Sequence, residues 1–297
     1  MMRALGDSKV PLYFLILTCI LNIVLDYALI LFFDMGVAGA GVATIFSQLV
    51  SAICCVIFIK KKMPAFWIRR EHFQISRREI SCHLKTAIPM AFQMSIIAIG
   101  ALILQFALNG LGPNAVAAYT AAQKIDNIAG MPLNSFGAAM ATYTAQNYGA
   151  GKLDRIRKGV FQCILMSVGT SIFMGVMNFF FGGTLASFFI GAGETEVIGY
   201  AQTFLSINGV LYWVLALLFI YRFTLQGLGN STVPTIAGIM ELIMRALGGL
   251  FLVDMLGFTG AALSNPLAWI GAFIPLTIAY YMEIHKLEKT HALETTA

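Results

Sequence analysis

Long apolar segments follow one another along most of the chain. Each is at least as long as the roughly 20 residues that a helix needs to cross the hydrocarbon core of a bilayer. They do not alternate apolar and polar residues as barrel strands do, and backbone groups in lipid must bond internally. The pattern therefore predicts an all-α, polytopic membrane helical bundle of about eight transmembrane helices. The predicted spans are Val10–Phe33, Val37–Ile59, Ala87–Leu111, Ala115–Ala145, Val160–Phe181, Val197–Thr224, Val233–Val253 and Phe258–Met282.

The basic residues gather on alternate connections between these spans. If the amino terminus is cytoplasmic, 17 of the 19 Lys and Arg lie on inside segments, Arg222 among them. The charged residues of the outside connections are all acidic. This asymmetry follows the positive-inside rule, so we expect a multi-pass protein of the cell membrane with both termini in the cytoplasm. The two exceptions, Lys124 and Arg245, fall within predicted helices.

The longest polar connection is predicted to be a cytoplasmic amphipathic segment, because it mixes charges with Trp67 and Phe73. It is the natural boundary between two helical bundles. The predicted organisation is two helices in 1–62, this connection in 63–85, six helices in 86–284 and a cytoplasmic tail in 285–297.

Composition agrees with a membrane protein and argues against other classes. Hydrophobic residues make up 59% of the chain and charged residues only 11%, whereas soluble domains carry about a quarter of their residues as charges. The net charge of +5 lies on one side of the predicted bundle, so no nucleic-acid partner is expected. The five Cys and four His lack metal-ligand spacing, and no HExxH, GxSxG or Walker A motif occurs, so the chain is predicted not to be an enzyme or an ATPase.

An internal repeat connects the two ends of the chain. Residues 3–11 (RALGDSKVP) match 226–234 (QGLGNSTVP), and residues 36–40 (GVAGA) match 257–261 (GFTGA). The repeated unit is a polar loop, an apolar helix beginning near a Pro, a Gly turn and a second helix. Both copies begin on the predicted cytoplasmic side, and such parallel repeats are known in transporters.

Six motifs resemble the multidrug and toxic compound extrusion (MATE) family. They are RALGDSKVP at 3–11, NIVLDYALI at 22–30, GVAGAGVATIFSQ at 36–48, AVAAYTAAQKI at 115–125, AQNYGAGK at 145–152 and QGLGNSTVP at 226–234. The resemblance implies two lobes of six helices, of which this chain would hold the last two helices of the N-lobe and the whole C-lobe. The N-lobe would be incomplete, with its helices 1–4 missing from the sequence.

The resemblance also implies a function. We expect export of small amphipathic cations or drugs by Na⁺ or H⁺ antiport, with no cofactor beyond the coupling ion and with the bilayer as partner. The helices equivalent to those that carry acids in some family members lack them here, which is more similar to the DinF-like branch. As a fragment, the isolated chain is expected not to export drugs. Two alternatives stay open: a lipid-linked sugar flippase of related architecture, and a truncated membrane protein without transport activity.

A first group of polar residues suggests a cation site. Asn22 and Asp26 are one helical turn apart and share a face, and Thr44 lies on the next predicted helix. A carboxylate, an amide oxygen and a hydroxyl suit Na⁺ or a carried proton, and an acid inside the membrane is a functional candidate. The resemblance implies that these three residues belong to the N-lobe cation site, whose fourth ligand would lie in the missing helices. Alternatively, Asn22 and Asp26 only hold helices together.

A second group lies on the fourth span. Polar residues recur there at helical spacing, which predicts a face toward a water-filled cavity that binds substrate. The candidates are Tyr119, Gln123, Lys124, Asp126, Asn127 and Asn134. Lys124 falls near the membrane midplane and is predicted to contact substrate or to gate; alternatively, a carboxylate elsewhere satisfies it. Glu241 and Arg245, at i and i+4 on the seventh span, are predicted to form a structural ion pair.

Overall fold

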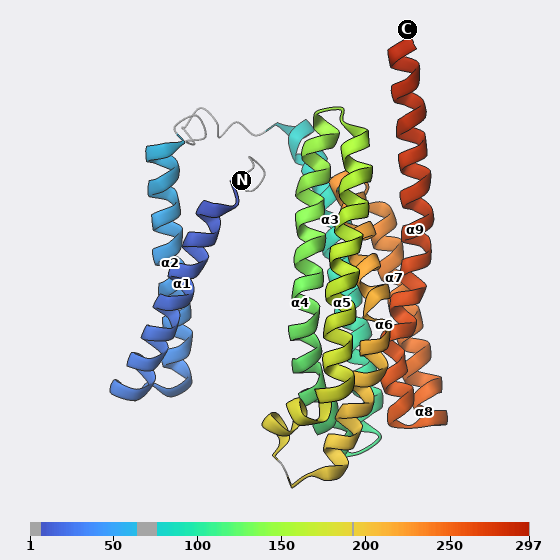
Figure 1. Cartoon of the computed structure of the whole chain (residues 1–297). Helices are drawn as coiled ribbons and strands as arrows, with labels where there is room; N and C mark the ends of the chain where they lie inside the picture. Colours follow the sequence, from blue (N-terminus) through green and yellow to red (C-terminus); the bar gives the residue numbers. More distant parts are fainter. Residues whose placement is uncertain (1–6, 64–75, 192, 297) are drawn as a thin grey trace. The chain divides into compact units, whose positions relative to one another are not determined.

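The computed structural model describes residues 7–63, 76–191 and 193–296, with side chains as far as residue 289. The chain forms two compact units, Met1–Arg77 (unit 1) and Arg78–Ala297 (unit 2), and each is described by itself (Figure 1). The division falls inside the predicted polar connection. The amphipathic character predicted for that connection depends on Trp67 and Phe73, which lie outside the described residues.

Unit 1 is a pair of antiparallel helices. Helix α1 (Lys9–Tyr27) continues as a π-helical segment, η2 (Ala28–Phe32), and α2 (Gly36–Lys62) returns along it. The buried residues of α2 are small ones at four-residue spacing, and α1 has none that are fully buried. Small residues let two helix backbones approach closely. The large apolar side chains of unit 1 are left on its surface, as expected for helices that face lipid or further helices.

Unit 2 is a bundle of long helices. Its elements are α3 (Arg77–Asn109), α4 (Pro113–Gly149), α5 (Leu153–Ile190), α6 (Thr195–Gly227), α7 (Thr232–Leu247), the π-helical η5 (Gly248–Leu252), α8 (Val253–Leu256) and α9 (Phe258–Thr296). Figure 1 shows the long helices lying alongside one another.

All eight predicted spans are helical, which confirms the predicted fold class, but several boundaries differ. Helix α3 begins at Arg77, so the last residues of the predicted connection are helical, and α9 continues through the predicted tail. Within the described residues, seven stretches are long and apolar enough to cross a membrane, and α4 is absent from that set. Its mean hydropathy is lowered by the polar face that predicted the cavity.

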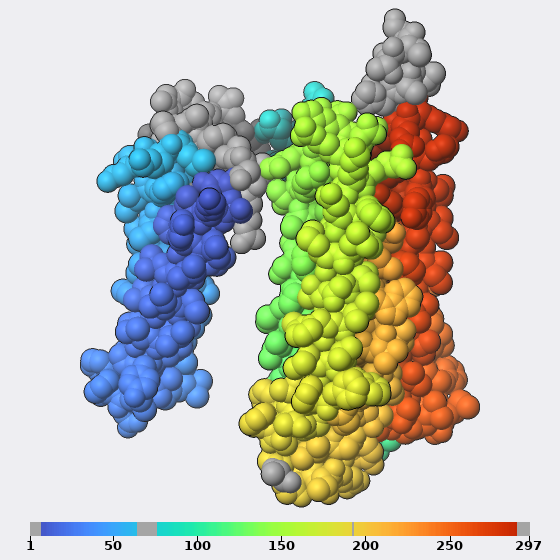
Figure 2. Space-filling model, viewed as in Figure 1, coloured from blue at the N-terminus to red at the C-terminus, as the bar shows by residue number. Residues whose placement is uncertain are grey.

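Helix α6 is the centre of unit 2. More than half of its most apolar stretch is buried, the largest share among the candidate spans. Phe204, Tyr212 and Leu218 have no exposed surface. A helix that is apolar on all sides is stable only when other helices surround it. By contrast, Figure 2 shows α5 running along the viewed face of unit 2. Helix α5 carries many exposed large apolar side chains, which suit contact with lipid; they include Phe161, Leu165, Ile172, Phe173, Val176 and Phe180.

The helix starts of the two repeat copies are capped alike. The Val10 amide donates to Asp7 Oδ1 at 3.2 Å, and the equivalent Val233 amide donates to Asn230 Oδ1 at 3.3 Å. A side-chain oxygen that accepts from a free amide of the first turn stabilises the helix start. The matched Asp7 and Asn230 therefore both cap the start of the helix that follows them.

The Gly turns of the repeat also agree. Gly36 and Gly257, at matched positions, have φ of +52° and +57°, which a side chain would strain. A π-helical segment precedes the turn in each copy, η2 after α1 and η5 after α7. The repeat detected in the sequence is thus a repeat of backbone conformation.

We predict that Gly175→Ala destabilises unit 2. A Cβ at Gly175 of α5 would collide with the backbone of Gly209 on α6, whereas one at Gly169, also on α5, would meet nothing within 4 Å. Overpacking costs about 1–3 kcal/mol, while Gly→Ala in an open helix position gains up to about 1 kcal/mol. Thermal melting of the purified chain in one detergent should show a lower Tm for G175A and an equal or higher Tm for G169A. A G175A protein as stable as the parent would show that α5 and α6 do not touch there.

Candidate functional site

The polar face of α4 forms one wall of a cavity inside unit 2. The cavity has a volume of about 1000 Å³, which is large enough for a drug-sized molecule. Five of the six predicted cavity residues line it, together with Gly130: they are Tyr119, Gln123, Asp126, Asn127 and Asn134. Residues three or four apart lie on one helix face, which is why spacing alone located this wall.

The other walls come from four helices. Helix α3 contributes Gln105, α7 contributes Arg245, and α9 contributes Asn265 and Trp269. Helix α6 adds apolar side chains, including Phe219. The lining is therefore mostly apolar, with a few amides and two charged side chains, a composition typical of small-molecule sites.

The acid on this lining is held by a buried chain of hydrogen bonds. The Tyr212 hydroxyl of α6 donates to Asp126 Oδ1 at 2.6 Å, and Asn178 Nδ2 of α5 donates to the Tyr212 hydroxyl at 2.9 Å. All three side chains are buried. The sequence interpretation missed Tyr212 and Asn178. Their signal was a polar group in an otherwise apolar span, which must find a partner when it is buried.

Lys124 does not line the cavity, contrary to prediction. Successive residues turn by about 100° around a helix, so Lys124 is displaced from the face that carries Gln123, Asn127 and Gly130. Its side chain is exposed, and its Nζ lies 5.4 Å from the centre of the Phe189 ring on α5. A cation over an aromatic ring at this distance is attracted by the ring electrons. The position of Lys124 along α4 does not determine which face of the helix carries it.

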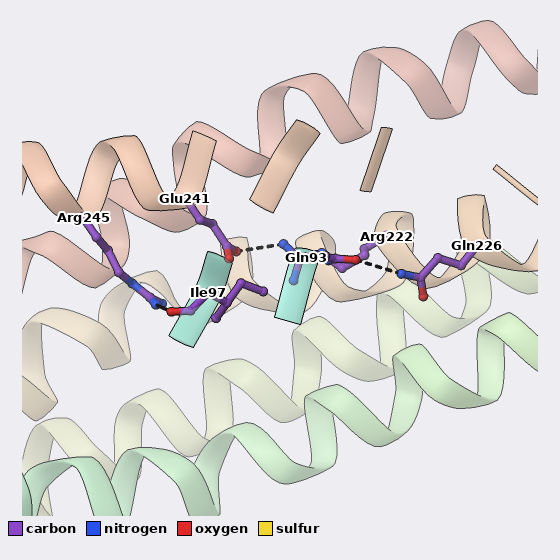
Figure 3. Close-up of polar contacts among 6 residues, drawn as sticks. All are labelled: Gln93, Ile97, Arg222, Gln226, Glu241 and Arg245. Atoms are coloured by element: carbon purple, nitrogen blue, oxygen red, sulfur yellow. Dashed lines mark hydrogen bonds and ion pairs between the residues drawn. The ribbon is translucent and has the colours of Figure 1, made fainter. Parts of the chain in front are cut away.

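The predicted ion pair between Glu241 and Arg245 is also wrong. Arg222 of α6 donates from Nη2 to Glu241 Oε1 at 2.8 Å, and both side chains are less than a tenth exposed (Figure 3). Arg222 counts among the inside residues, near the end of the predicted span Val197–Thr224, and it lies within α6. An i, i+4 pair contributes only about 0.2–0.5 kcal/mol, whereas a buried charge without a partner costs several kcal/mol. The free-energy cost of leaving the buried Arg222 charge without a partner therefore outweighs the gain of an i, i+4 pair, and Glu241 pairs with Arg222.

A polar seam joins α3 and α7. From α7, Thr235 donates to the Pro89 carbonyl at 3.0 Å, and Arg245 Nη1 donates to the Ile97 carbonyl at 3.3 Å. Gln226 of α6 donates to Gln93 Oε1 at 3.2 Å, and Figure 3 shows Arg245, Gln93 and Gln226 along one line together with the Arg222–Glu241 pair. In a membrane such bonds hold helices together where hydrophobic burial cannot.

Arg245 is placed by this seam beside the cavity. Its aliphatic stem packs against Gly100 of α3, where a Cβ would lie 3.3 Å from Arg245 Cδ. Among the described residues, its Nε is buried and has no hydrogen-bond partner. The guanidinium thus keeps donors that the protein around it does not use.

Two of the three predicted cation ligands are in contact in unit 1, and the third lies one helical turn along α1. Asn22 Nδ2 donates to Thr44 Oγ1 at 3.4 Å, and the Thr44 hydroxyl donates to the Ala40 carbonyl at 2.9 Å. Asp26 follows Asn22 by one turn of α1. Its Oδ1 is buried and, within the described part of the chain, accepts no hydrogen bond. Carboxylate, amide and hydroxyl oxygens suit a hard cation, so the residues present fit Na⁺ or a proton carried by Asp26.

Comparison with known proteins identifies relatives along most of the chain. The MatE family profile matches residues 89–250. The chain is 30% identical over 212 residues to the probable multidrug resistance protein YpnP of Bacillus subtilis, covering 71% of the chain and 46% of that protein. It is 28% identical over 290 residues to the probable multidrug resistance protein NorM of Thermotoga maritima, covering 91% and 58%. The chain thus spans about half the length of these curated relatives.

Solved structures show the same fold. A multidrug resistance MATE family transporter of the MOP superfamily, solved in an outward-facing conformation, superimposes with a TM-score of 0.88 at 22% identity, covering 96% of this chain and 64% of that one. A MATE structure in the bent conformation gives a TM-score of 0.84 at 22% identity, covering 97% and 64%.

We predict that Glu241→Gln destabilises unit 2 more than Arg245→Gln does. The first variant leaves Arg222 buried without an acid, which costs about 3–5 kcal/mol. The second removes a side chain whose charge has no carboxylate within ion-pair distance among the described residues. Size-exclusion profiles and melting of the solubilised variants should show a lower yield and Tm for E241Q. Equal damage from the two substitutions would instead support pairing between Glu241 and Arg245.

Proposed function

The chain belongs to the MATE family of membrane transporters, and we propose that it forms part of an exporter that exchanges small amphipathic organic cations for Na⁺ or H⁺. The family consists of transporters, so the chain is not an enzyme. The observation that carries the proposal is the group in unit 1, where Asn22 and Thr44 are in contact and the buried Asp26 Oδ1 has no hydrogen-bond partner among the described residues.

Asp26 is the proposed carrier of the coupling ion. A carboxylate inside a membrane is stable only with a proton, a cation or a basic partner. No described salt bridge involves Asp26, and the Asn22–Thr44 hydrogen bond uses the Asn22 amide N–H, which leaves its carbonyl oxygen to face an ion. A site that takes either Na⁺ or a proton at one carboxylate would let the two ions compete.

The cavity of unit 2 is the proposed substrate site. Its volume fits a drug-sized molecule, and Trp269 and Phe219 offer aromatic surface to an amphipathic ligand. Asp126 supplies a negative charge that favours a cationic group. The relatives named above for multidrug resistance favour export over the lipid-linked sugar flippase, for which we expect a more basic cavity than Arg245 alone provides, since Lys124 lies outside this one.

We further propose that both termini are cytoplasmic in the cell membrane. A membrane-impermeant maleimide added to intact cells should then fail to label Cys82 in a variant whose other four cysteines are serine. It should label a cysteine introduced as Glu194→Cys in a variant without native cysteines. Labelling of Cys82 in permeabilised cells is the control for its reactivity. Labelling of Cys82 in sealed cells would reverse the orientation.

The decisive variant for coupling is Asp26→Asn, which keeps the size of the side chain and removes its charge. Because the chain spans about half the length of its relatives, it is fused behind the amino-terminal part of the Bacillus subtilis relative and reconstituted in proteoliposomes. We expect D26N to lose efflux driven by an imposed Na⁺ or H⁺ gradient by at least about tenfold.

Asp34→Asn is the matched control. It makes the same substitution in unit 1 but in the turn after η2, where Asp34 has a φ of +50° that Asn tolerates well. D34N should transport like the parent fusion. If D26N also transports like the parent, Asp26 is structural and the proposed coupling site is refuted.

A further inference from the structure

The matched backbones of the two repeat copies allow their side chains to be compared position by position. Asn22 lies eleven residues after Pro11, and Arg245 lies eleven residues after Pro234. Both are reached through uninterrupted α-helix, since α1 runs to Tyr27 and α7 to Leu247. The repeat therefore places Arg245 where the proposed cation site has Asn22.

The other two cation-site positions can be matched in the same way. Thr44 lies eight residues after Gly36, and Asn265 lies eight residues after Gly257, each on one continuous helix. Asp26 is matched to Gly249 when residues are counted from the Pro and to Leu247 when they are counted back from the Gly turn, so the second copy has no carboxylate at either position. The second copy thus loses a negative charge and gains a positive one.

The matched residues of the second copy line the unit 2 cavity. Arg245 and Asn265 both belong to its lining. Arg245 is its one basic side chain among the described residues, since Lys124 is directed to Phe189. Within the described chain the guanidinium makes one hydrogen bond, to the Ile97 carbonyl, although it has five N–H donors.

The other charge on the lining, Asp126, is hydrogen-bonded at one oxygen and forms no direct ion pair with Arg245 among the described residues. The hydrogen bond is the one that Asp126 Oδ1 accepts from Tyr212. A guanidinium with unused donors in a mostly apolar cavity is a strong binding group for a carboxylate, sulfonate or phosphate. Asn265 can add an amide donor, and Trp269 lies on the same helix to pack against an apolar body.

We propose that the unit 2 cavity binds an amphiphilic ligand through an oxyanion group held by Arg245. This inference rests on the proposed function in treating the cavity as the substrate site, and it names a chemical group that the ligand carries. The oxyanion belongs either to a soluble zwitterion, whose cationic group can face Asp126, or to the headgroup of an anionic lipid. A binding measurement without an ion gradient tests it separately from coupled export.

The test uses the chain in phosphatidylcholine nanodiscs with two matched fluorescent probes. Dansylglycine carries a carboxylate, and dansylglycinamide is its neutral counterpart. Binding is followed by energy transfer from Trp residues, one of which, Trp269, lines the cavity, and the signal of empty nanodiscs is subtracted. We expect the parent to bind the acid at least about tenfold more tightly than the amide, in line with a charged hydrogen bond.

Three variants test whether Arg245 causes the preference for the acid over the amide. Arg245→Gln should bring the acid-to-amide ratio close to one while amide binding is kept, which also shows that the cavity is folded. Arg245→Lys should retain part of the preference. Lys124→Gln, the matched control, removes a positive charge of α4 outside the cavity and should leave the preference unchanged.

A parent that binds neither probe, or binds both equally, overturns the proposal, as does an R245Q protein that keeps the preference. If R245Q binds neither probe, the R245K variant is measured. An R245K protein that still prefers the acid supports the proposal, and one that binds the amide without preferring the acid overturns it. Nanodiscs that also contain phosphatidylglycerol separate the two sources. If the lipid headgroup is the occupant, phosphatidylglycerol weakens acid binding to the parent, and if a soluble ligand is, acid binding stays the same.

Discussion

A charged side chain inside a bilayer must have its charge matched by a neighbour or by water, and Arg222 meets this requirement with Glu241. The pair joins α6, the most buried helix of unit 2, to α7. Because Glu241 is bound to Arg222, Arg245 one turn further along α7 has to satisfy its own charge elsewhere. It is directed to the α3 backbone and to the cavity, so the position of one ion pair decides the charge that the cavity offers to a ligand.

The two repeat copies show that backbone and chemistry can be separated. Both copies have a cap, at Asp7 and Asn230, a left-handed turn, at Gly36 and Gly257, and a π-helical segment before that turn. These features fix where the helices start, bend and return, and they leave the residues on the inner faces free to differ. Among the described residues, one copy holds a carboxylate oxygen without a hydrogen-bond partner, and the other holds a guanidinium with unused donors. A single scaffold therefore provides sites of opposite polarity.

The helices and the α4 wall of the cavity could be predicted because each depends on periodicity within one segment. Apolar runs gave the spans, and four-residue spacing gave the face with Gln123 and Asn127. The errors involve partners from other segments. No local sequence pattern predicts that Glu241 pairs with Arg222 and not with Arg245. Nor does one predict that Tyr212 donates a hydrogen bond to Asp126. The π-helical segments were also missed, because the extra residue that produces them has no hydropathy signal.

Opposite polarity in the two copies has a consequence for coupling. If ion and ligand shared one carboxylate, direct competition would couple them, and no conformational change would need to transmit anything. An ion at Asp26 and an oxyanion at Arg245 do not compete, because they bear opposite charge and sit in different units. Each can then affect the other only by favouring one arrangement of the helices, and by linkage that effect must be reciprocal. The matched π-helical segments lie just beyond both groups on α1 and α7, where π-bulges often accompany functional sites. A change of helical register there would alter the depth of Asp26 or Arg245 relative to α2 or α9, which is the kind of motion that coupling between the two sites requires.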